Sequence, residues 1–192
     1  AVLPTGGGKS LCYQLPGLVR GGTTLVISPL IALMQAQLDD LKARGIHAFS
    51  LAGISNASAL ERIIDSAERC TPCFLFASPE KLKGQLVRIR LERLDIRTVA
   101  VDEAHCISAW GHDFRPDYRR LGLIRRLCPG VPMLALSATA APRVRADILR
   151  LLDLRSPLVQ VSSARRKNLR YAMQRRPRDP MPQVLEALEQ SR

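Results

Sequence analysis

The chain has 192 residues, of which 46% are hydrophobic and 24% are charged, and its formal net charge is +12. This length and composition suit one α/β domain, or one domain with part of a second, and exclude a wholly disordered, collagen-like or disulfide-rich chain. No apolar run approaches the roughly 18 residues that cross a bilayer, and no signal peptide is recognisable, so we expect no membrane association. The chain opens in the middle of a motif, and we expect it to be part of a longer protein.

The positive charge is concentrated in the second part of the chain. Residues 1–114 carry 12 basic and 11 acidic side chains, whereas residues 115–192 carry 17 basic and 6 acidic ones. A basic segment suits a polyanion such as nucleic acid, because each Lys or Arg that meets a phosphate releases counterions. An Arg-rich solvated surface would give the same count, so charge alone identifies no partner.

The cysteines are odd in number and lack the spacing of a disulfide framework, which indicates a reducing compartment. Cys70 and Cys73 form one C-x-x-C pair, which is typical of half a zinc site or of a redox pair, but no second pair follows. We expect instead that Cys70 ends a helix and that Cys73 opens a buried strand.

Strand-like and helix-like segments alternate along the chain. Short β-branched apolar runs predict strands, and apolar residues at helical spacing predict helices. In chain order the predictions are a helix from about residue 11, a strand at 24–27, a helix at 30–43, a strand at 46–51, a helix at 58–70, strands at 73–77 and 98–101, a helix at 118–127, a strand at 132–136 and a helix at 142–151. This alternation predicts an α/β fold with a mostly parallel sheet, helices on both faces and ligands at the carboxyl ends of the strands.

The pattern changes after residue 161. A basic stretch at 162–167 precedes a predicted strand at 168–173, a Pro- and Arg-rich segment and a helix from Pro182. We therefore predict that residues 1–163 form one domain and that residues 164–192 are a linker and the start of a second.

A Gly-rich loop precedes the first predicted helix. Glycines let backbone N–H groups approach phosphate oxygens, and the start of a helix adds positive potential. Lys9 can reach the β- and γ-phosphates, and the Ser10 hydroxyl can ligate Mg²⁺. The strict G-x-x-x-x-G-K-[ST] pattern is not met, because Leu3 stands at its first position, and a flexible turn is the alternative. The predicted phosphate-binding residues are Thr5, Gly6, Gly7, Gly8, Lys9 and Ser10.

Two adjacent carboxylates, Asp102 and Glu103, follow the predicted strand at 98–101. The first can hold a magnesium-bound water, and the second can orient or deprotonate the attacking water. Acidic residues also favour the first turn of a helix, so simple capping is the alternative. Together with the Gly-rich loop, the pair predicts a nucleoside triphosphate site.

These motifs resemble those of the RecQ family of ATP-dependent DNA helicases, in superfamily 2. The stretch from Asp102 to Tyr118 is the most specific, because other DEAH proteins are not expected to continue with W-G-H-D-F-R-P. The resemblance covers nearly the whole chain in family order: motif I at 3–16, motif Ia at 28–35, an SPE-type motif at 78–82, motif II with its aromatic-rich loop at 102–118, motif III at 137–139 and the entry to a second motor lobe at 168–171.

The resemblance implies a RecA-like P-loop NTPase lobe, with ATP and Mg²⁺ as ligands and single-stranded and partly duplex DNA as partners. It implies that Glu103, Asp102 and Lys9 are catalytic, and that Ser10 and Asp102 hold Mg²⁺. It also implies a set of DNA-binding and coupling residues: Ser28, Pro29, Ser78, His105, Trp110, His112, Phe114, Arg115, Ser137 and Thr139. A bacterial protein of this family would lie in the cytoplasm with the nucleoid, and a eukaryotic one in the nucleus. Protein partners are not indicated.

Two other interpretations concern the aromatic-rich segment. Trp110 and Phe114 would be buried core anchors if they did not contact DNA. His105 and Cys106 with His112 would form a metal site, although no further ligand is evident. We expect instead that His105 links the nucleotide site to motif III by a hydrogen bond to Ser137 or Thr139.

The function expected from the resemblance is that of a 3′-to-5′ DNA helicase motor lobe in recombination and repair. The alternatives are a DEAH-type RNA helicase or another superfamily-2 translocase, and a non-catalytic nucleotide-binding fragment. The arginine fingers of the family lie in a second lobe, so the chain alone is not expected to be active. Four positions depart from the family pattern without removing a catalytic group: Ala36, Lys81, Ala109 and Ser137.

Overall fold

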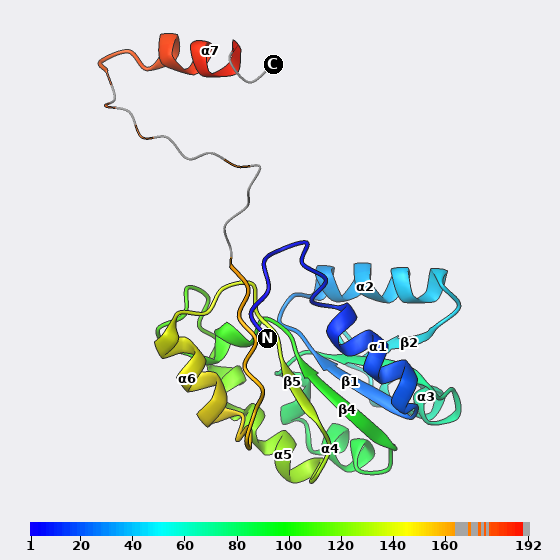
Figure 1. The fold of residues 1–192 in the computed structure, drawn as a ribbon. Helices are drawn as coiled ribbons and strands as arrows, with labels where there is room; N and C mark the ends of the chain where they lie inside the picture. The colour runs from blue at the N-terminus through cyan, green and yellow to red at the C-terminus, as the bar shows by residue number, and fades with distance from the viewer. Residues whose placement is uncertain (164–168, 170–172, 174, 176, 190–192) are drawn as a thin grey trace.

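A computed structural model describes residues 1–163, 169, 173, 175 and 177–189 (Figure 1). The strands are β1 (Thr23–Ile27), β2 (His47–Ser50), β3 (Cys73–Ala77), β4 (Ile96–Val101) and β5 (Met133–Ala135). The α-helices are α1 (Leu11–Arg20), α2 (Ile31–Ala43), α3 (Ala57–Arg69), α4 (Gln85–Leu91), α5 (Ile124–Leu127), α6 (Pro142–Leu151) and α7 (Met181–Glu189). The 3₁₀ helices are η1 (Lys81–Lys83), η2 (Ala104–Ile107) and η3 (Pro116–Leu123).

The strands form one parallel sheet in the order β2-β3-β1-β4-β5. Their register aligns the carboxyl ends, because Ile27 lies opposite both Ala77 and Val101, and Val101 lies opposite Ala135. The predicted parallel sheet is therefore confirmed. The segments that follow β1, β3, β4 and β5 all emerge at the same edge.

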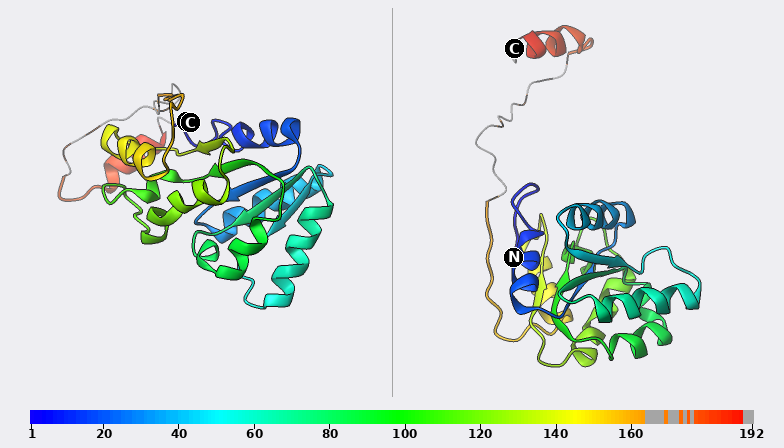
Figure 2. Two further views of the ribbon diagram at one scale, coloured as in Figure 1. Left: turned by 90° about the horizontal axis from the view of Figure 1, so that it is seen from below. Right: turned by 90° about the vertical axis from the view of Figure 1, so that its right-hand side faces the viewer.

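Helices cover both faces of the sheet (Figures 1 and 2). Successive side chains of a strand point to opposite faces, so each strand contributes to two cores. Leu25 and Ile27 of β1 join the core under α3, α4, η3, α5 and α6, whereas Val26 joins the core under α1 and α2. This double burial explains why the strands read as continuous apolar runs in the sequence.

The structure differs from the prediction in two segments. The helix predicted at 118–127 is a 3₁₀ helix followed by the single α-turn of α5. A side chain at Gly122 would place its Cβ 2.7 Å from the backbone oxygen of Leu151, so this segment packs backbone to backbone against α6. The short helix α4 was not predicted, since it has only seven residues and two buried positions, Val87 and Leu91.

Cys70 is the C-terminal cap of α3 and Cys73 begins β3, which confirms both expectations. Cys12, Cys70, Cys73, Cys106 and Cys128 are all free thiols. The described residues include no group of three or more His, Cys, Asp or Glu side chains that could hold a metal ion. Within the same residues, no helix has both the length and the apolar character needed to cross a membrane.

The C-terminal helix predicted from Pro182 begins at Met181, and it has no buried residue. The strand predicted at 168–173 and the entry to a second lobe at 168–171 lie, apart from single residues, outside the described part of the chain. The division after residue 163 therefore stays a prediction.

Candidate nucleotide and nucleic-acid site

The Gly-rich loop lies at the carboxyl edge of the sheet. Val2 forms a parallel bridge to Ser137, the residue that follows β5 and Leu136, and the N–H of Leu3 donates to the Ser137 oxygen at 3.0 Å. The chain then turns through residues 5–10 and enters α1 at Leu11. The loop is therefore held between the edge of the sheet and the start of a helix.

The loop conformation requires its glycines. Gly6 and Gly8 have φ angles of 79° and 77°, which side chains rarely adopt, and a Cβ at Gly7 would lie 2.8 Å from the Pro4 oxygen. Within the described residues, the N–H groups of Gly8, Lys9 and Ser10 donate to no protein acceptor. Free donors at the start of a helix suit an anion, so the loop fits the phosphates of a nucleotide.

A cleft of about 530 Å³ opens over this loop. Its walls are the loop, the acidic pair Asp102 and Glu103, and the face of α2 that carries Leu33 and Gln37. All the predicted phosphate-binding residues except Gly7 line it. The structure therefore brings the two halves of the predicted nucleotide site, 93 positions apart in the sequence, into one cleft.

Asp102 is held rigidly at the end of β4. Its N–H donates to the Ile27 oxygen at 2.8 Å, and the buried Tyr118 hydroxyl donates to its backbone oxygen at 2.9 Å. Burial raises the pKa of the Asp102 carboxyl, and the neighbouring Glu103 raises it further. A cation beside this carboxylate would favour its ionised form, so the site suits a divalent metal.

Glu103 has a left-handed backbone, with φ 46° and ψ 43°. This conformation is uncommon for a residue other than glycine, and such strain concentrates at functional sites. Its Oε2 lies 3.3 Å from Nδ1 of His105. The hydrogen bond from His105 lowers the pKa of Glu103, more than burial raises it. The carboxylate is therefore ionised at neutral pH, as a general base must be.

His105 links this carboxylate to the segment after β5. Its Nδ1 lies 3.0 Å from the Ser137 hydroxyl, and that hydroxyl donates to the Thr139 oxygen at 2.7 Å. Because the single hydroxyl proton is used at Thr139, Ser137 must accept from His105, which assigns a proton to Nδ1. This one N–H is therefore shared between the Ser137 hydroxyl and Oε2 of Glu103. The expected hydrogen bond between His105 and motif III is confirmed.

We call residues 108–115, which follow η2, the aromatic loop. Trp110 is 64% exposed and Phe114 is 38% exposed, so the alternative that they are buried core anchors is wrong. An arginine lies over each ring, with Arg143 Cζ 3.9 Å from the Trp110 centroid and Arg119 Cζ 5.8 Å from the Phe114 centroid. Exposed rings beside arginines suit bases and phosphates of a single strand.

The aromatic loop is connected to the nucleotide side. The His112 ring stacks on His105, with centroids 4.3 Å apart and planes at 17°. A second cavity, of about 290 Å³, is lined by Glu103, His105 and His112 together with Pro29 and Thr139. Glu103 thus faces both the nucleotide cleft and the predicted coupling residues.

Arg115 is turned inward rather than toward solvent. Its guanidinium donates to the Pro29 oxygen at 3.1 Å and lies 3.4 Å from an Asp113 carboxylate oxygen. It therefore ties the aromatic loop to the segment after β1. A direct phosphate contact by Arg115 would require these bonds to open.

Ser28 and Ser78 are buried directly after β1 and β3. The Ser28 hydroxyl has no hydrogen-bond partner in the part of the chain that is described. Both residues lie at the carboxyl edge of the sheet, and their contact with DNA stays a prediction.

Sequence reasoning missed several residues around this site. Tyr13, fully buried in α1, donates to Gln37 at 2.6 Å, and Gln37 faces Asp102 across the cleft. Tyr118 anchors Asp102, and Arg143 covers Trp110. Helical spacing marked Tyr118 as part of a helix, but nothing in the sequence showed which distant residue it contacts.

Comparison with known proteins gives a consistent set of relatives. The family model described as "DEAD/DEAH box helicase" matches residues 1–148. The chain is 44% identical over 170 residues to a probable ATP-dependent DNA helicase RecS of Bacillus subtilis, covering 88% of this chain and 34% of the relative. It is 45% identical over 172 residues to the ATP-dependent DNA helicase RecQ of Pasteurella multocida, covering 90% of this chain and 27% of that protein. The chain thus spans about a third of these relatives, or less.

A solved structure shares the fold. The crystal structure of the Pyrococcus furiosus Hef helicase domain superimposes with a TM-score of 0.62 and 21% sequence identity, over 79% of this chain and 33% of that one. The two chains therefore share the fold of a parallel sheet flanked by helices.

Proposed function

Because the chain belongs to the DEAD/DEAH box helicase family, with RecQ-type DNA helicases among its relatives, we propose that it is the first motor lobe of a 3′-to-5′ DNA helicase. In this proposal the lobe binds Mg·ATP and single-stranded DNA, and it couples ATP hydrolysis to unwinding in recombination and repair. Residues 1–163 form the lobe, and residues 164–192 are the linker and the start of a second lobe.

One observation carries the proposal. Glu103 lines the cleft over the Gly-rich loop, and it also lines the cavity that Pro29, His112 and Thr139 form. A single carboxylate therefore stands between a nucleotide site and an exposed aromatic loop. Such a position suits a residue whose chemistry must respond to DNA.

The residues of the cleft have separate tasks. Lys9 and the backbone N–H groups of Gly8, Lys9 and Ser10 bind the β- and γ-phosphates. Ser10 and Asp102 hold Mg²⁺, which when bound neutralises charge on the phosphates. Glu103 accepts a proton from the attacking water, and His105 keeps its carboxylate ionised and oriented. The hydrogen bond from His105 to Ser137 and the stack on His112 carry a change at Glu103 toward the aromatic loop.

The first test is the thermal midpoint of the chain with and without Mg·ATP, for the wild type and for Lys9→Ala. Binding to the native state alone stabilises it by about 2.7 kcal/mol at a hundred times the dissociation constant. For a chain of this size that is a rise of about 5–10 °C. We expect the rise in the wild type and not in Lys9→Ala.

Lys42→Ala is the matched control, because Lys42 is exposed on α2 and does not line the cleft. It should keep the full rise. A wild type without any rise, or an equal rise in Lys9→Ala, would contradict the nucleotide site.

Phe114→Ala tests the DNA side of the proposal in the full-length protein. We expect the ring to stack on bases, so its loss should reduce stimulation of ATP hydrolysis by single-stranded DNA while hydrolysis without DNA is unchanged. Stacking on one base contributes about 1–3 kcal/mol, so the half-saturating DNA concentration should rise by about 5- to 150-fold. Unchanged stimulation rejects this role, and stronger stimulation by RNA than by DNA would favour an RNA helicase instead.

A further inference from the structure

Helix α6 lies between motif III and the aromatic loop. It begins at Pro142, directly after the Ser137–Thr139 segment that receives the hydrogen bond from His105. Its buried residues Val144 and Ile148 belong to the same core as Ile107 and Tyr118, which flank the aromatic loop. The helix is therefore packed against both ends of the loop.

The first contact between α6 and the loop is a hydrogen bond from a buried serine to a partly exposed aspartate. The hydroxyl of Ser108, which is fully buried, donates to Asp147 at 2.7 Å. The same hydroxyl oxygen accepts from the N–H of Trp110 at 3.2 Å. Hydrogen bonds from Arg150 and Ser108 lower the pKa of Asp147, which is therefore a charged acceptor. Asp147 thus holds the backbone at Trp110 through one shared hydroxyl.

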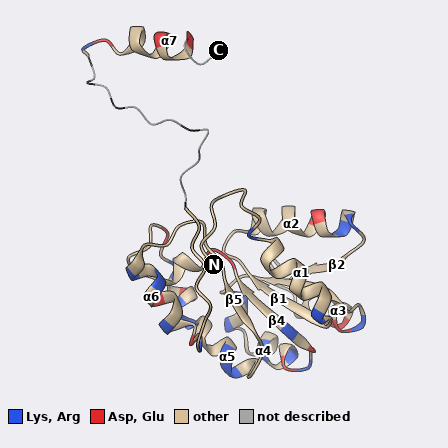
Figure 3. Cartoon of the chain, viewed as in Figure 1, with Lys and Arg blue, Asp and Glu red and all other residues tan. Residues whose placement is uncertain are grey.

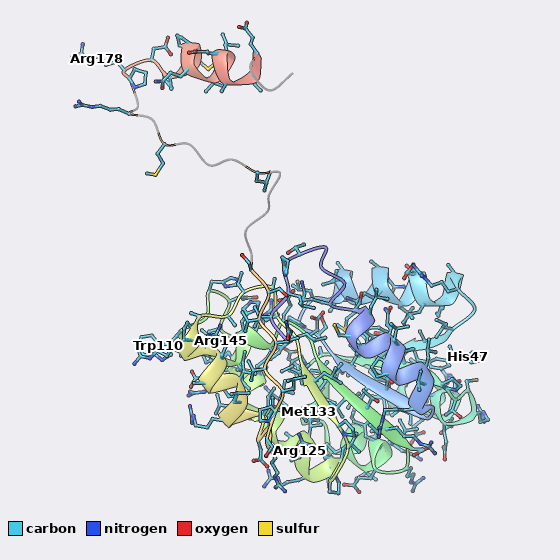
Figure 4. The ribbon with its side chains drawn as sticks, in the orientation of Figure 1. His47, Trp110, Arg125, Met133, Arg145 and Arg178 are labelled. Atoms are coloured by element: carbon cyan, nitrogen blue, oxygen red, sulfur yellow. The ribbon has the colours of Figure 1, made fainter. Side chains whose placement is uncertain are left out.

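The second contact is a cation–π interaction. Arg143, in the first turn of α6, lies 3.9 Å from the centroid of the Trp110 ring. The ring is otherwise largely exposed and projects from the surface beside α6 (Figure 4). Its orientation therefore depends on Arg143 rather than on the core.

The loop between these contacts has little room to deform. A Cβ at Gly111 would lie 2.6 Å from the His105 oxygen and 3.2 Å from the Ser108 oxygen. The N–H of Gly111 also donates to the Ser108 oxygen at 3.0 Å. If α6 moves, Trp110 should consequently move with it, because the backbone of the aromatic loop cannot deform enough to leave the ring in place.

We propose that Asp147 and Arg143 are positioning residues, which make Trp110 follow α6 when the nucleotide changes the Ser137–Thr139 segment. The proposal rests on the proposed function only for the identity of the nucleotide and of the DNA. Basic residues continue along α6 and the neighbouring α5 (Figure 3), so a displaced Arg143 would remain beside a surface suited to phosphates.

The chain contains a single tryptophan, so fluorescence excited at a wavelength that its three tyrosines do not absorb reports Trp110 alone. Without any nucleotide, Arg143→Ala should raise the quenching of this fluorescence by acrylamide, because one face of the ring loses its cover. Arg143→Lys should restore part of the protection. Arg126→Ala is the control, since Arg126 is exposed on α5 and does not contact the ring. Equal quenching in Arg143→Ala and the wild type would overturn the role of Arg143.

The second measurement adds Mg·ADP and records both the fluorescence of Trp110 and the thermal midpoint. The wild type should show a fluorescence change and a rise in midpoint. Asp147→Ala should keep the rise and lose the change, whereas Asp147→Asn, which retains an acceptor for Ser108, should recover part of it. Asp39→Ala, at an exposed position of α2, should behave as the wild type.

The two measurements separate the possible failures. A rise in midpoint with an unchanged fluorescence response in Asp147→Ala overturns the positioning role and leaves the nucleotide site intact. A rise without any fluorescence change in the wild type also overturns it. No rise in the wild type contradicts the proposed function, and the acrylamide comparison then still decides whether Arg143 positions Trp110.

Discussion

Glu103→Gln is expected to keep Mg·ATP binding and to lower the DNA-stimulated rate of ATP hydrolysis by about 10²- to 10⁴-fold, the usual contribution of a general base. The amide has nearly the shape of the carboxylate and can still accept the hydrogen bond from His105 at Nδ1. It cannot accept a proton from water at neutral pH. The loss should therefore fall on kcat, with little change in the concentration of ATP that half-saturates the enzyme.

The rate is best measured in the full-length protein, because the chain spans 34% or less of the two bacterial relatives described above. The rise in thermal midpoint with Mg·ATP, measured in the same variant, separates lost chemistry from lost binding. Glu92→Gln at the end of α4 is the matched control, and it should hydrolyse ATP normally. Normal turnover by Glu103→Gln would contradict the assignment of the base.

Phe74→Ala is expected to lower the free energy of unfolding by about 3–5 kcal/mol, the usual effect of removing a fully buried ring. Phe74 is 0% exposed in β3, its ring centroid lies 6.3 Å from that of Tyr13, and it contacts the position of Gly17 in α1. For a chain of this length the thermal midpoint should fall by about 6–20 °C.

The substitution should also weaken nucleotide binding in the cleft. Tyr13 lies in α1, the helix that the Gly-rich loop enters, so a cavity beside its ring loosens the base of the cleft. Phe49→Ala on the edge strand β2 removes the same atoms from a partly buried position and should cost clearly less. Urea unfolding of both variants makes the comparison, and equal losses would show that Phe74 is not a principal support of this core.

Much of the fold follows from simple features of the sequence. The runs at Thr24–Ile27 and Cys73–Ala77 are buried at every position and apolar apart from Thr24, because both faces of the sheet are covered, and this pattern predicts parallel strands. The Gly-rich loop and the acidic pair were therefore expected to lie close together, since the carboxyl ends of parallel strands lie at one edge of the sheet. The cleft between Lys9 and Asp102 was predictable for that reason.

Other features depend on contacts that no local pattern encodes. Asp147 and Arg143 lie on a helix whose boundaries were predicted correctly, yet their partners Ser108 and Trp110 are more than 30 positions earlier. Only the packing of α6 against η2 brings them together. The backbone of Glu103 was equally unpredictable, because glutamate has no preference for the left-handed region.

The backbone conformation at position 103 favours glycine, whereas the two cavities beside it call for a carboxylate. Glycine would adopt φ 46° without strain, and a chain selected only for folding would gain from it. Glycine would also remove the carboxylate that faces both cavities. In the proposed function, position 103 therefore gives up some conformational stability in order to keep the general base.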